Sequence, residues 1–194
     1  MEPITLSTDR LRLRPFTPED ADAVYDACQD PDIQRWTTVP SPYGRADAEL
    51  FVTRIAPEGW RLDGEYVFAV EPLEGGPLLA ATGLHARGPG VREVGYWLAK
   101  EHRGHGYMTE AVTALARWAI GSLGVHRLLW RAEVGNAPSR AVAERVGFTV
   151  EGVERAGLVN NGTVRDCWLG SLLPSDLGLP SPLPYLPPRA TPED

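Results

Sequence analysis

Hydrophobic and polar residues recur along the first half of the chain in patterns that predict strands and helices. Leu11-Arg12-Leu13-Arg14 alternates as a half-buried strand does. Pro18-Glu19-Asp20 opens a helix that we expect to reach Asp30, and residues 45–55 predict a second helix. Further strands are expected at residues 66–71, 79–85 and 92–98.

The second half continues the alternation of helices and strands. Residues 108–119 carry apolar side chains at helical spacing, and glycines mark the end of that helix. Pro138 stands where the first turn of a helix tolerates proline, and we expect this helix to reach Val146. Strands are expected at residues 126–134, 148–155 and 164–172. This order is typical of a mixed α/β (α+β) domain.

The composition changes after residue 173. Seven prolines fall among residues 174–194, where hydrophobic periodicity is lost. Proline lacks the backbone N–H that the interior of a sheet or helix needs. We therefore expect one domain over residues 1–173, followed by a proline-rich C-terminal tail over residues 174–194.

Length and cysteine content limit the class of protein. With 194 residues the chain can bury a sizeable core without disulfides or metals. Cys28 and Cys167 stand far apart, so neither a disulfide framework nor a zinc site is indicated. The N-terminus lacks a signal-peptide pattern, and no segment approaches the roughly twenty apolar residues of a membrane span. We expect a cytoplasmic protein that does not enter the membrane.

The charge balance is acidic, with a net charge of −7 and a pI near 5.1. Nucleic-acid binding usually requires a basic surface, so we expect no nucleic-acid partner. An acidic surface can attract cationic acceptors such as amines, although the same charge also serves solubility alone.

A glycine-rich turn, Arg103-Gly104-His105-Gly106-Tyr107-Met108-Thr109, lies between a predicted strand and a predicted helix. Its two glycines let the backbone bend sharply, and the start of the following helix presents free N–H groups and the positive end of the helix dipole. The turn therefore favours an anionic, phosphate-bearing ligand.

Other interpretations of this turn are weaker or remain open. A mononucleotide loop would need Lys followed by Ser or Thr after the last glycine, where Tyr107-Met108 stands. A dinucleotide loop would need a third glycine at position 109, which is Thr. A turn that uses glycine only for its geometry stays open on these residues alone.

Two further segments, residues 136–148 and residues 93–98, carry motifs that bear on the function of the turn. Residues 136–148 run Asn-Ala-Pro-Ser-Arg-Ala-Val-Ala-Glu-Arg-Val-Gly-Phe, and residues 93–98 run Glu-Val-Gly-Tyr-Trp-Leu. With the opening segment 8–16 and the closing hairpin 152–168, this ordered set resembles the GCN5-related N-acetyltransferase (GNAT) superfamily. The resemblance is to its RimJ/RimL-like branch, which acetylates ribosomal protein N-termini, and it covers nearly residues 5–173.

The resemblance implies a fold and a co-substrate. The fold would be a mixed, mostly antiparallel sheet of about seven strands with helices on both faces, in which strands four and five (92–98 and 126–134) splay apart. The co-substrate would be acetyl-CoA, its pantetheine arm pairing beside strand four like an extra strand. No metal is implied. Residues that the resemblance assigns to the co-substrate are Trp97, Leu98, Arg103, Gly104, His105, Gly106, Tyr107, Met108, Thr109, Asn136 and Ser139.

Two of these assignments have alternatives. Met108 departs from the Gly or Ala of the family pattern, which backbone amide contacts should tolerate. Asn136, followed by Pro138, can equally cap a helix with no ligand present.

Acetyl transfer needs a neutral amine, a polarised carbonyl and a proton for the leaving thiolate. The resemblance makes Glu93 the candidate base, although a Glu on a strand face is often only solvated. Ser139 is the candidate proton donor, because Ala143 stands where many relatives carry a tyrosine acid. Leu158 stands where some N-terminal acetyltransferases place a Glu, so the resemblance supports the reaction better than the acceptor.

We therefore expect an acetyl-CoA-dependent N-acetyltransferase that acts on a primary amine, either a peptide N-terminus or a small molecule. The alternative is a CoA-binding regulatory or scaffold module without turnover; a nucleotide-binding enzyme is more distant. His102 and His105 lack a second ligand pair for a metal, and His85 is a candidate to line the acceptor pocket or a structural residue. A homodimer is common among relatives, but no residue here decides it.

Overall fold

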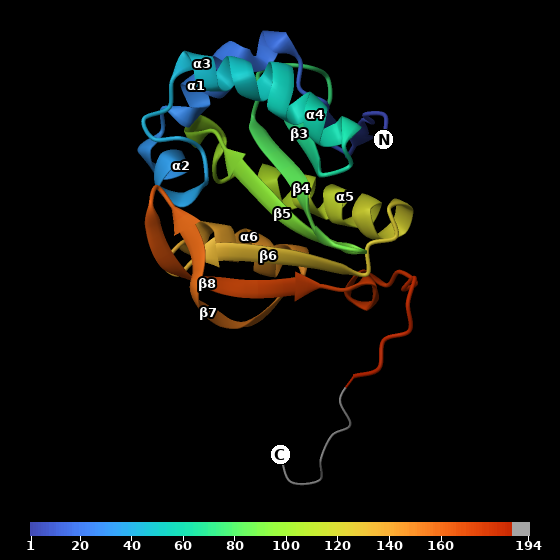
Figure 1. Cartoon of the computed structure of the whole chain (residues 1–194). Coiled ribbons are helices and arrows are strands. Elements are labelled where there is room, and N and C mark those ends of the chain that lie inside the picture. The colour runs from blue at the N-terminus through green and yellow to red at the C-terminus, as the bar shows by residue number, and fades with distance from the viewer. Residues whose placement is uncertain (188–194) are drawn as a thin grey trace.

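An eight-stranded sheet organises the chain, described here over residues 1–187 of a computed structural model (Figure 1). Its strand order is β1-β2-β3-β4-β5-β6-β8-β7, and among these strands only β5 and β6 pair in parallel. The strands are β1 (Leu6–Ser7), β2 (Leu11–Arg14), β3 (Glu65–Pro72), β4 (Ala80–Gly88), β5 (Val91–Leu98), β6 (Arg127–Glu133), β7 (Thr149–Asn160) and β8 (Thr163–Leu172).

Helices cover both faces of this sheet, as predicted (Figure 1). One face of β3 packs Val67 and Ala69 against the apolar sides of α1 and α3, and its other face packs Phe68 and Val70 into the cluster that contains α5 and α6. The alternation of side chains along a strand produces these two cores. The helices are α1 (Ala21–Cys28), α2 (Pro31–Trp36), α3 (Arg45–Leu50), α4 (Ala56–Arg61), α5 (Tyr107–Ser122) and α6 (Ala137–Val146).

The mixed, mostly antiparallel sheet is confirmed, with eight strands where about seven were expected. The additional strand is the two-residue β1, too short to leave a pattern in the sequence. Residues 92–98 and 126–134, the fourth and fifth predicted strands, correspond to β5 and β6.

Three predicted boundaries were wrong. The first helix ends at Cys28, and a separate helix, α2, follows because Asp30 accepts a hydrogen bond from Asp32 N and starts a new helix before Pro31. The second helix passes through a π-helical turn, Phe51–Ile55, and continues beyond Ile55 as α4, where Pro57 occupies a first-turn position. Strand β7 extends to Asn160, because its pairing with β8 resumes after an irregularity between Glu154 and Leu158.

Beyond β8 the chain forms a short 3₁₀ turn, Pro174–Leu177, and Leu177 and Leu179 pack against the core. The remainder of the predicted tail reaches residue 187, and residues 188–194 lie outside the described residues. Among the described helices, none is both long and apolar enough to cross a bilayer.

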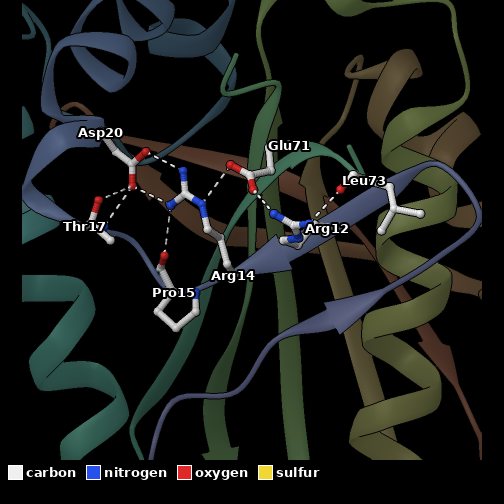
Figure 2. Close-up of polar contacts among 7 residues, drawn as sticks. All are labelled: Arg12, Arg14, Pro15, Thr17, Asp20, Glu71 and Leu73. Atoms are coloured by element: carbon white, nitrogen blue, oxygen red, sulfur yellow. Dashed lines mark hydrogen bonds and ion pairs between the residues drawn. The ribbon is translucent and has the colours of Figure 1, made fainter. Parts of the chain in front are cut away.

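A charged network fastens the start of the domain to the sheet (Figure 2). Arg14 on β2 donates two hydrogen bonds to Asp20, of 2.7 and 2.8 Å, and a third to Glu71 on β3, of 2.8 Å. Arg12 approaches the other oxygen of Glu71 at 3.3 Å, and Thr17 N donates to Asp20. Both carboxylates are buried, at 7% exposure each, so their charge depends on Arg14.

The guanidinium of Arg14 also sets the protonation of Asp20. Burial by itself would raise the pKa of Asp20, but the hydrogen bonds from Arg14 and Thr17 outweigh it and the pKa is lowered. Because the pKa in the folded state lies below the value in the unfolded chain, this pair stabilises the fold above about pH 4. The stabilisation is lost as the pH falls through the folded-state pKa.

We predict that Arg14→Met lowers the free energy of unfolding by about 3 kcal/mol at pH 7, because it leaves the buried Asp20 without its cation and Glu71 with only Arg12. Arg12→Met should cost less than about 1 kcal/mol, since the Arg12 side chain is 42% exposed. Urea unfolding at pH 7 and pH 3.5 measures both. The Arg14→Met deficit should shrink at the lower pH, and an unchanged deficit would contradict the electrostatic explanation.

Candidate active site

Strands β5 and β6 pair over only four residues and then separate. Their parallel register begins at Val91 and Arg127 and ends at Val94 and Trp130. Figure 1 shows the two strands adjacent at their starts and diverging toward their ends. From Gly95 onward the side of β5 that faces β6 is therefore released from the sheet, and its backbone groups can pair with a ligand.

A cleft of about 600 Å³ opens where these strands part. Its walls come from β5 and β6 and from the start of α6, where Asn136 and Ser139 lie. Asn136 Oδ1 accepts a hydrogen bond from Ser139 N, so it caps α6 as well as lining the cleft. Capping and ligand contact are thus compatible in this position, because the amide nitrogen of the side chain is not used by the cap.

The glycine-rich turn leads from the end of β5 into α5. Gly104 and Gly106 have φ angles of 83° and 78°, the left-handed region that favours glycine. Helix α5 starts at Tyr107, and the N–H groups of its first turn have no partner within the helix. The side chain of Met108 is buried in the core, so its size does not obstruct these amides.

Arg10 holds this turn in place, a role that the sequence did not indicate. Its Nη1 donates to the carbonyl oxygen of His105 at 3.1 Å, and its Nε donates to Glu110 on α5 at 2.7 Å. The guanidinium also lies 5.0 Å from the ring centre of Tyr107. A residue on the β1–β2 hairpin thereby fixes the turn from about 95 positions away.

The predicted co-substrate residues lie in two groups. Those that line the cleft are Trp97, Leu98, Arg103, Met108, Asn136 and Ser139. Those in the turn and the start of α5, beyond the cleft lining, are Gly104, His105, Gly106, Tyr107 and Thr109. The guanidinium of Arg103 is bound by Asp30 at 2.6 Å and by the carbonyl of Leu98 at 3.3 Å, so it joins the turn to the α1–α2 junction.

Three side chains meet at the inner end of the cleft. The hydroxyl of Ser139 accepts a hydrogen bond from Trp130 Nε1 at 3.0 Å and lies 3.1 Å from the hydroxyl of Tyr96. Tyr96 also lies 3.0 Å from the carbonyl oxygen of Ser139, which can only accept. The phenol therefore donates to that carbonyl, and either hydroxyl can donate in the contact between Tyr96 and Ser139.

Burial raises the pKa of Tyr96 to about 12, so the phenol keeps its proton at neutral pH. Tyr96 was not among the predicted site residues, although it stands within the segment Glu93-Val94-Gly95-Tyr96-Trp97-Leu98 that carried the resemblance. Its role becomes visible only through its contact with Ser139, 43 residues later.

Glu93 lies on the cleft wall, where its Oε2 meets two cations. Arg87 Nε donates to that oxygen at 2.7 Å, and Arg131 Nε donates to it at 3.0 Å. The carboxylate is thus neutralised by two guanidinium groups of the cleft. The prediction that Glu93 is the base remains a prediction.

Helix α2 spans the mouth of the cleft. Arg35 forms two hydrogen bonds of 2.6 Å to Glu133 on β6, and this partnership lowers the pKa of Glu133. The side chain of Asn160, at the end of β7, donates to the carbonyl of Arg35 at 3.1 Å. Figure 1 places α2 at the end of the sheet toward which β5 and β6 diverge.

Two positions depart from the family pattern described above. Ala143 lies on the buried side of α6, and the apolar side chain of Leu158 lines the cleft. Within residues 1–187, no cluster of three or more His, Cys, Asp or Glu side chains has the geometry of a metal site.

Comparison with known proteins agrees with this geometry. The sequence model of the family described as "Acetyltransferase (GNAT) domain" matches residues 10–149. The curated protein "Putative ribosomal N-acetyltransferase YdaF" of Bacillus subtilis is 38% identical over 132 residues, which are 66% of this chain and 72% of that protein.

Two solved structures share the fold. RimJ of Mycobacterium smegmatis, solved in complex with CoA-disulfide, has a TM-score of 0.79 at 21% identity and covers 92% of each chain. The microcin C7 self-immunity acetyltransferase MccE, solved with acetyl-CoA and AMP, has a TM-score of 0.77 at 19% identity and covers 86% of this chain and 93% of its own. With the family match over most of the chain, these findings show that the chain belongs to the GNAT family and is an N-acetyltransferase.

Proposed function

We propose that this N-acetyltransferase uses acetyl-CoA and transfers the acetyl group to a primary amine, either the α-amine of a protein N-terminus or a small-molecule amine. The observation that carries the proposal is the cleft that lies beside the released edge of β5 and reaches Ser139, with Arg103 and Met108, which flank the glycine-rich turn, also in its lining. We place the pyrophosphate at the turn and the thioester near Ser139.

The turn suits the pyrophosphate because it offers N–H groups at the positive end of α5 without side chains at Gly104 and Gly106. The edge of β5 from Gly95 to Leu98 suits the amides of a pantetheine arm, which would pair with it as a strand does. Acetyl-CoA in the MccE structure and CoA-disulfide in the RimJ structure support this choice of co-substrate by fold.

The transfer itself is a direct attack in a ternary complex. The amine nitrogen forms a bond to the thioester carbonyl carbon, and the carbon–sulfur bond then breaks with its electron pair on sulfur. Ser139 donates its proton to that thiolate and regains one from solvent, while the nitrogen of the new amide releases its extra proton to solvent. A hydrogen bond from Trp130 Nε1 and the contact with the Tyr96 hydroxyl hold the Ser139 hydroxyl in place for this step.

An N-terminal α-amine needs little help from a base to become neutral. An α-amine with a pKa near 7.8 is already about one in seven neutral at pH 7, whereas a lysine side chain is about one in a few thousand. The name of the B. subtilis relative points in the same direction. Leu158 supplies no carboxylate at the position where some N-terminal acetyltransferases place a Glu, so the proposal includes small amines as well as N-termini.

The competing proposal from another class is a CoA-binding module without turnover. Thiol release from acetyl-CoA separates the two. We expect release with at least one member of a panel of N-terminal peptides, polyamines, amino acids and aminoglycosides, and a rise in melting temperature with CoA. A thermal shift without release from any amine would favour the binding module.

Gly106→Val should weaken CoA binding about tenfold, because a β-branched residue is strained in the left-handed region and the strain distorts the turn. Gly121→Ala is the matched control, since Gly121 lies in α5 with open space beside it. Isothermal titration with CoA measures both. Equal affinities of the two variants would show that the turn does not hold the co-substrate.

Ser139→Ala should lower kcat about 100-fold while leaving the CoA affinity within about twofold, because only the proton donation is lost. Tyr96→Phe, which keeps the ring but removes the hydroxyl that contacts both the carbonyl and the side chain of Ser139, should lower kcat by about tenfold because Ser139 is less well positioned. Steady-state thiol release and CoA titration give the two quantities. Full activity of Ser139→Ala would remove Ser139 from the mechanism.

A further inference from the structure

The face of the sheet opposite α5 carries a second part of the cleft. Gly83 on β4 and Gly95 on β5 are cross-strand partners, so the floor between them has no side chains. His85 and Glu93 form the next pair along the same face. The Tyr96 side chain points to the opposite face, toward α6, so the two sides of the cleft meet where β5 and β6 part.

The side chain of His85 packs against the backbone of Gly95. A Cβ placed on Gly95 would lie 3.0 Å from His85 Nε2, so the ring nitrogen sits directly beside the backbone of β5. Gly95 is therefore required at this position for the imidazole to reach the strand that borders the co-substrate path. The ring is about one-third exposed and lines the cleft.

Glu65 determines which nitrogen of His85 is free. Glu65 on β3 is the cross-strand partner of His85, and its Oε1 lies 3.1 Å from His85 Nδ1. A carboxylate can only accept, so the proton of a neutral imidazole resides on Nδ1, and the lone pair resides on Nε2, which lies beside the Gly95 backbone in the cleft lining. The hydrogen bond to His85 lowers the pKa of Glu65, which keeps this carboxylate ionised at neutral pH.

Glu93 is less well placed than His85 to accept a proton from an ammonium group. Its Oε2 already receives hydrogen bonds from Arg87 and Arg131, so an incoming ammonium would have to displace a guanidinium or share the charge. His85 Nε2 has no hydrogen-bond partner within the described residues. An imidazole is also the side chain whose proton affinity best matches neutral pH.

We propose that His85 is the general base of the acetyl transfer and that Glu65 is the residue that positions it. This inference rests on the proposed function. His85 Nε2 takes a proton from the acceptor's ammonium, and the neutral amine attacks the thioester carbonyl across the gap between β5 and β6. The resulting imidazolium releases that proton to solvent through the open side of the cleft.

The charged groups that face His85 define the expected pH dependence. They are Glu65 on β3, Arg87 on its own strand, Glu93 on β5 and, beyond Glu93, Arg131 on β6. The two acids and two arginines balance one another in formal charge. We expect the rate to fall at acid pH, where nearly all of the acceptor amine is protonated.

The first test compares His85→Asn, Glu93→Gln and the control His126→Asn, whose side chain lies at the start of β6 against Gly90. With an accepted N-terminal peptide at pH 7, we expect His85→Asn to lower kcat/KM by about sevenfold, because about one α-amine in seven is already neutral without the base, and Glu93→Gln by less than about twofold. His126→Asn should match the wild type. Equal CoA-induced thermal shifts confirm that each variant is folded.

The pH profile distinguishes a base from a packing residue. The deficit of His85→Asn should shrink above about pH 8, where the α-amine is largely neutral without help. A deficit that stays constant with pH, or a full loss in Glu93→Gln with an active His85→Asn, would overturn the assignment of His85.

The role of Glu65 is tested by the tautomer of His85. Long-range ¹H–¹⁵N NMR should show the proton on Nδ1 in the wild type and a shift toward Nε2 in Glu65→Gln, with kcat/KM lowered by about threefold. A wild-type proton on Nε2 would refute the positioning role. Absence of thiol release from the wild type with every amine would overturn the proposed function and this inference together, whereas an active wild type with an undiminished His85→Asn would overturn the inference alone.

Discussion

The site depends on the point at which β5 and β6 stop pairing. Four residue pairs join the two strands in parallel, and the register ends at Val94 and Trp130. A sheet that continued to pair would bury the edge of β5 and close the space between its two faces. Because it stops, backbone groups that would have bonded to β6 become available to a ligand, and side chains from opposite faces come within reach of one cleft.

The separation is held by interactions from outside the two strands. Helix α2 joins the end of β6, through Arg35 and Glu133, to the hairpin of β7 and β8, through Asn160. On the other side, Arg103 binds Asp30 near the start of α2. Charge-assisted hydrogen bonds thus tie α2 and the chain before it to β6 on one side and to the glycine-rich turn on the other.

The two sides of the cleft have different chemistry. On the α6 side, Ser139, Tyr96 and Trp130 form a set of hydrogen bonds among groups that keep their protons at neutral pH. On the opposite side, His85 and Glu65 offer a proton acceptor beside a floor of glycine. In the mechanism that we propose, the proton donor for the thiolate and the proton acceptor for the ammonium lie on opposite faces of the sheet.

The sequence by itself determined the features that short segments encode. The glycine-rich turn, the cap formed by Asn136 and the order of strands and helices follow from backbone preferences and hydrophobic periodicity within a few residues. The family also follows from motifs in a fixed order. Helix α2 was missed because a six-residue helix directly after another has almost no periodicity of its own.

Only the tertiary structure decided which side chains meet. Tyr96 contacts Ser139 from 43 residues away, Arg10 holds the carbonyl of His105, and Glu65 reaches His85 because their strands are in register. It also showed that Glu93 is already paired with two arginines. Such contacts depend on strand register and on the packing of helices against the sheet, which no local pattern specifies, because a shift of one residue would turn each of these side chains to the other face.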